Sequence, residues 1–197
     1  MNTPTKLTVS RIVMSIIIMG IMIFPFSNIG IDVPVIRCGI DLNVKYVMCA
    51  FLFIVASFTD FLDGYLARKN NQVTDLGKML DAIADKILVN PILIIFASEG
   101  VISPIVPVVV VTRDIVVNAI KMEASRKGKT VAAISSGKIK TASMMVGIVL
   151  LYLGDIPFIF MNVRIDLLLV YFATIMSLVS MVEYYRLNKN LIKSDII

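Results

Sequence analysis

Six long apolar segments, separated by short polar connections, most constrain the fold of this 197-residue chain. A helix needs about 20 mostly apolar residues to cross a bilayer. Such segments lie near residues 7–26, 44–66, 79–97, 102–120, 139–153 and 165–184. Only 17% of the residues are charged, against about 25% in an ordinary soluble domain. The sequence therefore predicts an all-α integral membrane protein, in which residues 1–197 form a single domain, a bundle of six transmembrane helices.

The lysines and arginines divide unequally between the two sides of such a bundle. With six spans, both chain ends lie on the same side of the membrane. The connections between spans two and three and between spans four and five lie on that side too. Of the 19 basic residues, only Arg37, Lys45 and Arg164 fall on the other side. The basic side of a membrane protein faces the cytoplasm. We therefore expect a multi-pass protein of the bacterial plasma membrane, with both termini in the cytoplasm.

The composition excludes several classes of chemistry. The chain has no histidine, which rules out a Ser-His-Asp triad, a Cys-His nucleophile and His-ligated zinc. Its two cysteines, Cys38 and Cys49, are too few for a disulfide framework or a cysteine metal cage. A net charge of +5 suits nucleic acid only on a soluble basic face with aromatic residues. We therefore expect contact with membrane lipid and no nucleic-acid partner.

Acidic residues gather where the second span ends and the third begins, although each carboxylate at mid-membrane costs at least about 2.5–3.5 kcal/mol. Asp60 and Asp63 are three residues apart and Asp81 and Asp85 are four apart, so each pair projects from one helix face. The short turn between the helices lets the pairs converge at the cytoplasmic end. Converging carboxylates require a cation. Oxygen ligands favour Mg²⁺ or Mn²⁺, and two ions suit a phosphoryl or pyrophosphate substrate.

Small residues lie on the same helix faces as the aspartates. Gly64 and Ala67 each follow an aspartate of the first pair by four residues, and Gly77 precedes Asp81 by four. Glycine inside a helix costs about 0.8–1.0 kcal/mol relative to alanine, so a glycine beside each acidic pair indicates a ligand that approaches the backbone closely. Arg68, four residues after Gly64, adds a planar cation suited to phosphate.

Together these residues form one spaced motif, Asp60-x-x-Asp63-Gly64-x-x-Ala67-Arg68, eight residues, then Gly77-x-x-x-Asp81-x-x-x-Asp85. The motif resembles the signature of the CDP-alcohol phosphatidyltransferase family at all eight fixed positions. Two later segments, TRDIVVNAIK and SGKIKT, resemble the phosphatidylglycerophosphate synthase branch of that family. The resemblance implies a phospholipid-synthesising membrane enzyme whose active site lies at the cytoplasmic end of the bundle and whose substrates are CDP-diacylglycerol and glycerol-3-phosphate.

The resemblance also implies a role for each residue of the motif. Asp60, Asp63 and Asp81 would hold the divalent ions that bind the pyrophosphate of CDP-diacylglycerol. Asp85 would also lie at the metals and would act as the general base. The base takes the proton of a glycerol-3-phosphate hydroxyl, which attacks the phosphorus bearing diacylglycerol and expels CMP. The cytidine diphosphate site would be lined by Gly64, Ala67, Arg68 and Gly77.

Four basic residues at the cytoplasmic ends of the fourth and fifth spans are candidates to bind the acceptor phosphate: Arg113, Lys121, Lys138 and Lys140. Arg113 lies inside an apolar run, where an unpaired charge is costly. The chain departs from the branch at two positions in this region. It has Asp114 where the branch usually has glutamate, and Lys121 where it has arginine, and lysine does not make the bidentate phosphate contact of arginine.

Two alternatives stay open from the residues. The same chemistry with another acceptor, such as inositol phosphate, serine or phosphatidylglycerol, needs the same aspartates. A divalent-cation transporter also places carboxylates in a membrane, although it predicts them near mid-bilayer on several spans. A possible homodimer is implied by the family alone.

Overall fold

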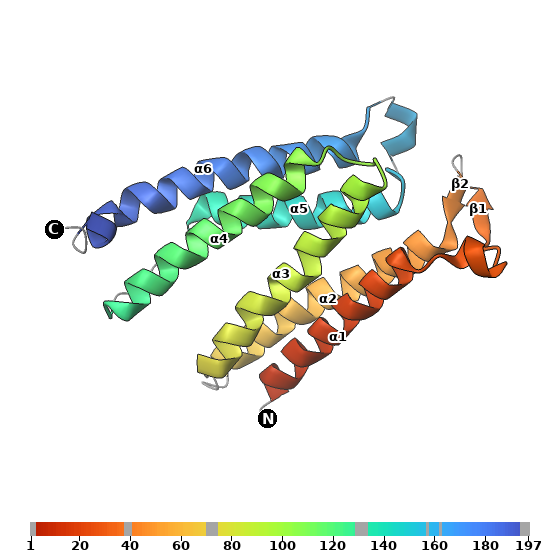
Figure 1. Ribbon diagram of the computed structural model, residues 1–197. Helices are drawn as coiled ribbons and strands as arrows, with labels where there is room; N and C mark the ends of the chain where they lie inside the picture. Colours follow the sequence, from red (N-terminus) through yellow and green to blue (C-terminus); the bar gives the residue numbers. More distant parts are fainter. Residues whose placement is uncertain are drawn as a thin grey trace.

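Six long helices make up most of the protein (Figure 1). The computed structural model describes residues 3–37, 41–69, 75–128, 134–156, 158–161 and 163–193. The helices are α1 (Thr3–Ile23), α2 (Val44–Lys69), α3 (Asp75–Ser98), α4 (Ile105–Arg126), α5 (Ser135–Tyr152) and α6 (Ile165–Lys193). Each covers most of one predicted apolar segment, so the prediction of a mostly helical protein is confirmed.

The connection between α1 and α2 contains a hairpin that the sequence analysis did not predict. A short 3-10 helix, η1 (Phe26–Ile29), precedes the strands β1 (Val35–Arg37) and β2 (Asp41–Asn43). The strands pair antiparallel, with Ile36 opposite Leu42. A second 3-10 helix, η2 (Phe158–Met161), lies between α5 and α6. Strands of three residues are too short for an apolar–polar alternation to be visible in the sequence.

The helices form two groups of three. α1 packs along α2 and α3, while α6 packs along α4 and α5, and the groups meet where α2 contacts α5 and α3 contacts α4. Figure 1 places the start of α1 and the end of α6 away from the β1–β2 hairpin. The end of α2, the start of α3, the end of α4 and the start of α5 therefore lie at the same end of the bundle as both termini.

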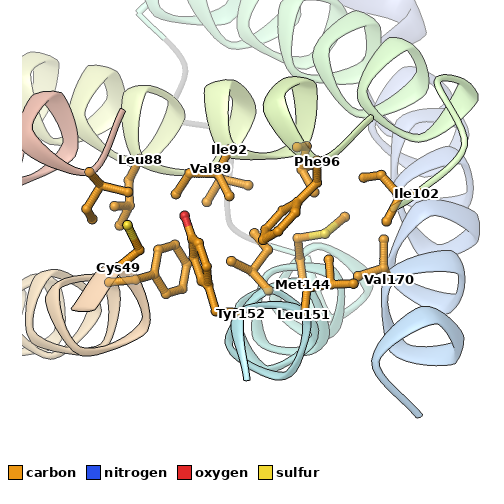
Figure 2. Close-up of a cluster of buried hydrophobic side chains, with 14 of the residues drawn as sticks. Cys49, Leu88, Val89, Ile92, Phe96, Ile102, Met144, Leu151, Tyr152 and Val170 are labelled. Atoms are coloured by element: carbon orange, nitrogen blue, oxygen red, sulfur yellow. The ribbon is translucent and has the colours of Figure 1, made fainter. Parts of the chain in front are cut away.

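Buried aromatic rings join the two helix groups (Figure 2). The ring of Tyr152 in α5 lies 4.9 Å from that of Phe96 in α3 and 6.3 Å from that of Phe53 in α2, centroid to centroid. Its hydroxyl donates to the sulfur of Met22 in α1, at 3.1 Å. All four side chains are 4% exposed or less. This apolar core fixes the helices relative to one another and leaves the charged ends free to form a site.

Two of the described helices are long and apolar enough to cross a membrane, Lys6–Ile23 in α1 and Ile165–Lys189 in α6. Protein buries only 28% and 33% of their apolar windows. Large side chains on α6, such as Leu168 and Ile175, are more than half exposed. Large exposed apolar side chains on helices of this length suit contact with lipid. The crossing of all six helices remains a prediction.

A glycine allows α5 and α6 to approach closely. A Cβ atom added at Gly147 would lie 2.8 Å from Cγ2 of Val170, 3.3 Å from its backbone nitrogen and 3.4 Å from Cβ of Leu169. Two of these three atoms belong to a branched side chain and a helix backbone, neither of which moves easily. Gly147 is therefore required by the packing of the helix pair that carries one wall of the site.

Replacing Gly147 by alanine is expected to destabilise the protein by about 1–3 kcal/mol, because the added methyl group overpacks the α5–α6 contact. Gly20→Ala is the matched control, since a Cβ atom at Gly20 in α1 meets nothing within 4 Å and alanine favours a helix. Thermal unfolding in detergent should therefore show a lower midpoint for Gly147→Ala and an unchanged or higher one for Gly20→Ala. Equal midpoints for the two variants would contradict the packing role of Gly147.

Candidate active site

A cavity of about 560 Å³ opens among α2, α3, α4, α5 and α6 at the end of the bundle that holds both termini. Acidic and basic residues predicted from the sequence meet in its walls. Its predicted members are Asp60, Asp85, Arg113, Lys121, Lys138 and Lys140. A cavity of this size suits a small molecule with charged groups at its two ends.

Two of the predicted carboxylates converge on a buried arginine from α1: Asp60, which lines the cavity, and Asp81, which is not among its lining residues. Arg11 donates through Nη1 to Oδ1 of Asp60 in α2 and through Nη2 to Oδ1 of Asp81 in α3, the latter at 2.6 Å. Arg11 is 0% exposed, whereas the carboxylate side chains are 34% and 54% exposed. In the sequence, Arg11 is one of the 16 basic residues (19 less Arg37, Lys45 and Arg164) on the predicted cytoplasmic side. Its two hydrogen bonds show that Asp60 and Asp81 share one cation across two helices.

The other residues of the motif are placed less completely. Asp85, half-buried in α3, lines the cavity together with Asp60. Gly77 also lies in α3. The backbone of Asp63, Gly64, Ala67 and Arg68 belongs to α2, but their side chains lie outside the described part of the chain. Within the part that is described, no group of three or more carboxylates or cysteines forms a complete metal site.

The donor set nevertheless fits a hard divalent cation. Asp60 and Asp81 present oxygen atoms from separate helices to one positive group, the Arg11 guanidinium. Carboxylate oxygens are the ligands that Mg²⁺ and Mn²⁺ prefer. The guanidinium thus marks a place where these two side chains already hold a cation.

On the opposite wall, Arg113 of α4 is fixed by two neighbours. Its Nε and Nη2 atoms donate to the hydroxyl oxygen of Ser180 in α6, at 3.0 and 2.8 Å, and Nη1 donates to Oδ1 of Asp114 at 3.0 Å. The Ser180 hydroxyl in turn donates to the carbonyl of Ser177, at 2.9 Å. With its fork held in place, the guanidinium loses little freedom when an anion binds.

Asp114 also orients a second cation. Its Oδ1 atom lies 3.4 Å from Nζ of Lys140 in α5, and both residues are buried, with 8% and 6% exposure. One carboxylate therefore faces two cations, Arg113 and Lys140. Lys121 and Lys138 also line the cavity, so positive charge predominates on this wall. Such a wall attracts a phosphate group.

Tyr184 of α6 completes the basic wall. Its ring centroid lies 5.8 Å from Cζ of Arg113 and 5.4 Å from Nζ of Lys121. The ring is 3% exposed and lies in a small apolar cluster with Val117 and Ile120 of α4. A cation near an aromatic face is stabilised by the ring quadrupole. Tyr184 therefore helps to hold Arg113 and Lys121 toward the cavity.

Gly137, in the first turn of α5, lies beside Arg113 and Tyr184. A Cβ atom at Gly137 would lie 3.5 Å from Nη2 of Arg113 and 4.0 Å from Cε2 of Tyr184. The next residue, Lys138, and Lys140 line the cavity from the same first turns of α5. The segment SGKIKT thus begins a helix in which Gly137 lies beside Arg113, and Lys138 and Lys140 add two more cations to the cavity wall.

Comparison with known proteins identifies the family. The sequence model of the CDP-alcohol phosphatidyltransferase family matches residues 1–183. The chain belongs to the CDP-alcohol phosphatidyltransferase family. Both walls of the cavity lie mainly within the matched residues, with Tyr184 immediately after them.

Several relatives in this family carry the same name, CDP-diacylglycerol–glycerol-3-phosphate 3-phosphatidyltransferase. The chain is 35% identical over 194 residues to the one from Bacillus subtilis (strain 168), across 98% of each chain. It is 31% identical over 191 residues to that of Wigglesworthia glossinidia brevipalpis, across 94% of this chain and 93% of the relative. The Mycoplasma genitalium relative is 40% identical over 111 residues, 56% of this chain and 47% of its own length. Family membership and the two apolar helices, α1 and α6, together indicate a membrane protein.

Proposed function

We propose that the protein is a CDP-diacylglycerol–glycerol-3-phosphate 3-phosphatidyltransferase, which forms phosphatidylglycerol phosphate and releases CMP in phospholipid biosynthesis. The observation that carries this proposal is the single cavity in which Asp60 and Asp85 face four cations from α4 and α5. The family match and the relatives similar over nearly the whole chain support the reaction and the acceptor.

The acidic wall holds the metal in this proposal. Asp60, Asp63, Asp81 and Asp85 bind Mg²⁺ or Mn²⁺, with two ions expected from the family resemblance. When bound, the ions neutralise the pyrophosphate of CDP-diacylglycerol and stabilise the departing CMP. The convergence of Asp60 and Asp81 on the Arg11 guanidinium supports this assignment. Gly64, Ala67, Arg68 and Gly77 are proposed to line the cytidine diphosphate site.

Asp85 is proposed to accept the proton of the acceptor hydroxyl. It lines the same cavity as the cations of the opposite wall, so an acceptor whose phosphate is bound there can present its hydroxyl to the carboxylate. The hydroxyl oxygen then forms a bond to the phosphorus that bears diacylglycerol, while the bond from that phosphorus to the oxygen of CMP breaks. The proton passes to Asp85.

The phosphate of glycerol-3-phosphate is proposed to bind Arg113, Lys121, Lys138 and Lys140. Arg113 and Lys140 are set in place by Asp114, and Ser180 directs the guanidinium fork. A doubly charged phosphate group is the natural partner of such a set of donors. Serine carries no phosphate and no net charge, so it would neutralise these cations less well, which favours glycerol-3-phosphate over serine. The same lysines and the arginine lie beside the carboxylates and would repel a divalent cation that passed through, which disfavours the transporter alternative.

The membrane arrangement belongs to the same proposal. All six helices cross the bilayer, both termini are cytoplasmic and the cavity opens at the cytoplasmic face of a bacterial plasma membrane. The concentration of basic residues at the end of the bundle that holds both termini supports this orientation. A homodimer is proposed on the family resemblance alone.

Release of CMP from CDP-diacylglycerol by the purified protein in detergent tests the function. With Mg²⁺, we expect release in the presence of glycerol-3-phosphate and little with inositol phosphate, serine or phosphatidylglycerol. EDTA should abolish the release, and excess Mg²⁺ or Mn²⁺ should restore it. Release of CMP with a different acceptor would leave the proposed reaction chemistry standing but would replace glycerol-3-phosphate as the acceptor. Folded, metal-loaded protein that releases no CMP with any acceptor would contradict the proposal.

A further inference from the structure

Arg11 occupies an unusual position for a basic residue near the start of a membrane protein. It lies in the middle of α1, is 0% exposed, and reaches carboxylates on two other helices, Asp60 of α2 and Asp81 of α3. The positive-inside rule places arginines at the cytoplasmic surface, but it does not require burial. A fully buried guanidinium is costly to desolvate, so its place must be stabilised by the charges around it.

The same two carboxylates are the proposed metal ligands of α2 and α3. Each presents its Oδ1 atom to the guanidinium, and a divalent cation would need oxygen atoms of the same two side chains. A positive charge this close to a divalent cation is also strongly repelled, even at an effective dielectric constant of about 20. A divalent cation bound by Asp60 and Asp81 would therefore compete with the guanidinium for the same two side chains.

We propose that Arg11 is a built-in counter-cation, which neutralises Asp60 and Asp81 in the metal-free enzyme and is displaced from them when the divalent ion binds. Arg11 thereby performs two tasks. It prevents the carboxylates of α2 and α3 from repelling each other while the site is empty, and it lowers the affinity of the site for metal. Arg11 is a positioning residue in this sense and does not act on the reacting atoms. The inference rests on the metal site of the proposed function.

A different role for Arg11 would change the metal affinity in the opposite direction when Arg11 is removed. If the guanidinium stayed beside the metal and helped to assemble the carboxylates around it, its removal would weaken metal binding. If Arg11 gives way to the metal, its removal strengthens metal binding. The sign of the change in affinity therefore decides between the two roles, without any measurement of turnover.

Mn²⁺ binding, followed by electron paramagnetic resonance of the free ion, tests the inference on the full-length protein in detergent. We expect Arg11→Gln to lower the Kd for Mn²⁺ by about tenfold or more, because a neighbouring positive charge is lost. Arg37→Gln is the matched control. Arg37 is an arginine in β1 whose side chain is 88% exposed, and its removal should change the Kd by less than about twofold, because exposed charges are screened.

Thermal unfolding gives a second readout. Metal-free Arg11→Gln should unfold at a lower temperature than the metal-free wild type, since two carboxylates lose their counter-ion. Saturating Mn²⁺ should raise its midpoint more than it raises that of the wild type. If Arg11→Gln does not fold without metal, Arg11→Lys replaces it. Lysine keeps the charge but lacks the fork that bridges two carboxylates, so we expect a Kd about threefold lower than that of the wild type.

Two results would overturn the inference, and they are distinguishable. An unchanged or raised Kd in Arg11→Gln and Arg11→Lys, with Mn²⁺ bound by all proteins, would remove the competing role of Arg11 and leave the metal site intact. Absence of Mn²⁺ binding in the wild type and in both variants would overturn the proposed metal site, and the role of Arg11 with it. Binding by the variants that exceeds binding by the wild type supports both.

Discussion

Replacing Asp85 by asparagine is expected to lower kcat for CMP release by about 10²- to 10⁴-fold, the usual contribution of a general base. Asparagine has nearly the same shape and keeps one oxygen atom, but it cannot accept the proton of the acceptor hydroxyl. Asp85 lines the cavity with Asp60 on its own side and the basic residues of α4 and α5 opposite. The rate should be measured with both substrates and Mg²⁺ saturating, so that weaker binding does not lower it.

Two controls separate loss of the base from loss of the metal. Mn²⁺ binding by Asp85→Asn, measured as for Arg11, shows whether the site is loaded when the rate is determined. Asp41→Asn, in the β1–β2 hairpin, removes a carboxylate that is 74% exposed and is expected to leave the rate within about twofold of the wild type, because an exposed pair contributes little. Near-normal turnover by metal-loaded Asp85→Asn would show that another group accepts the proton.

The helices and most candidate site residues could be predicted because their signals are local in sequence. An apolar run of about 20 residues indicates a helix wherever it packs. The spacings of three and four residues between the aspartates fix their helix face before the tertiary structure is known. The four predicted acceptor cations lie within 28 residues of sequence, and all of them line one cavity.

Arg11 could not be assigned in this way, because its environment depends on how α1 packs against α2 and α3. In the sequence it is one of many basic residues on the predicted cytoplasmic side, and nothing near it is acidic. Its partners Asp60 and Asp81 are 49 and 70 residues away. Its one distinguishing feature in the sequence is its place within the first apolar run, near residues 7–26. A charge in such a run is retained only when a partner exists.

The supports of the basic wall were missed for the same reason. In the sequence, Asp114 stands out only as a departure from the usual glutamate, although it orients both Arg113 and Lys140. Ser180 lies 67 residues after Arg113, and serine within an apolar helix carries no distinctive pattern. Contacts that close across helices are set by packing, and single-sequence periodicity does not contain them.

The carboxylates at the start of α6 also could not be assigned from the sequence. Asp155, with a positive φ of 64°, accepts hydrogen bonds from the backbone nitrogens of Ile165 and Asp166, at 3.0 and 3.1 Å. Asp166 is itself buried and accepts a hydrogen bond from Arg164, at 2.6 Å. These carboxylates satisfy the free N–H groups at a helix start, where negative charge is favourable. They are structural, and they lie at the end of the bundle opposite the cavity.

Replacing Arg113 by glutamine is expected to lower kcat/KM for glycerol-3-phosphate by about 10²-fold, because a charge-assisted contact to phosphate is worth about 1.5–3 kcal/mol. The KM for CDP-diacylglycerol should change by less than about threefold, since that substrate is proposed to bind at the acidic wall. Kinetics with each substrate varied in turn, in mixed micelles, measure both quantities. Lys140 remains 3.4 Å from Asp114, so the variant does not leave that buried carboxylate without a cation.

Arg113→Lys separates the charge from the geometry of the fork. Lysine keeps the positive charge but cannot donate to both Ser180 and Asp114 while facing a phosphate. We therefore expect a raised KM for glycerol-3-phosphate with a smaller loss of kcat, and a partial recovery relative to Arg113→Gln. Ser180→Ala should act in the same direction and more weakly, because it frees the guanidinium without removing it. Equal losses for both substrates in Arg113→Gln would show that the basic wall supports the whole site, and would move the acceptor phosphate away from Arg113.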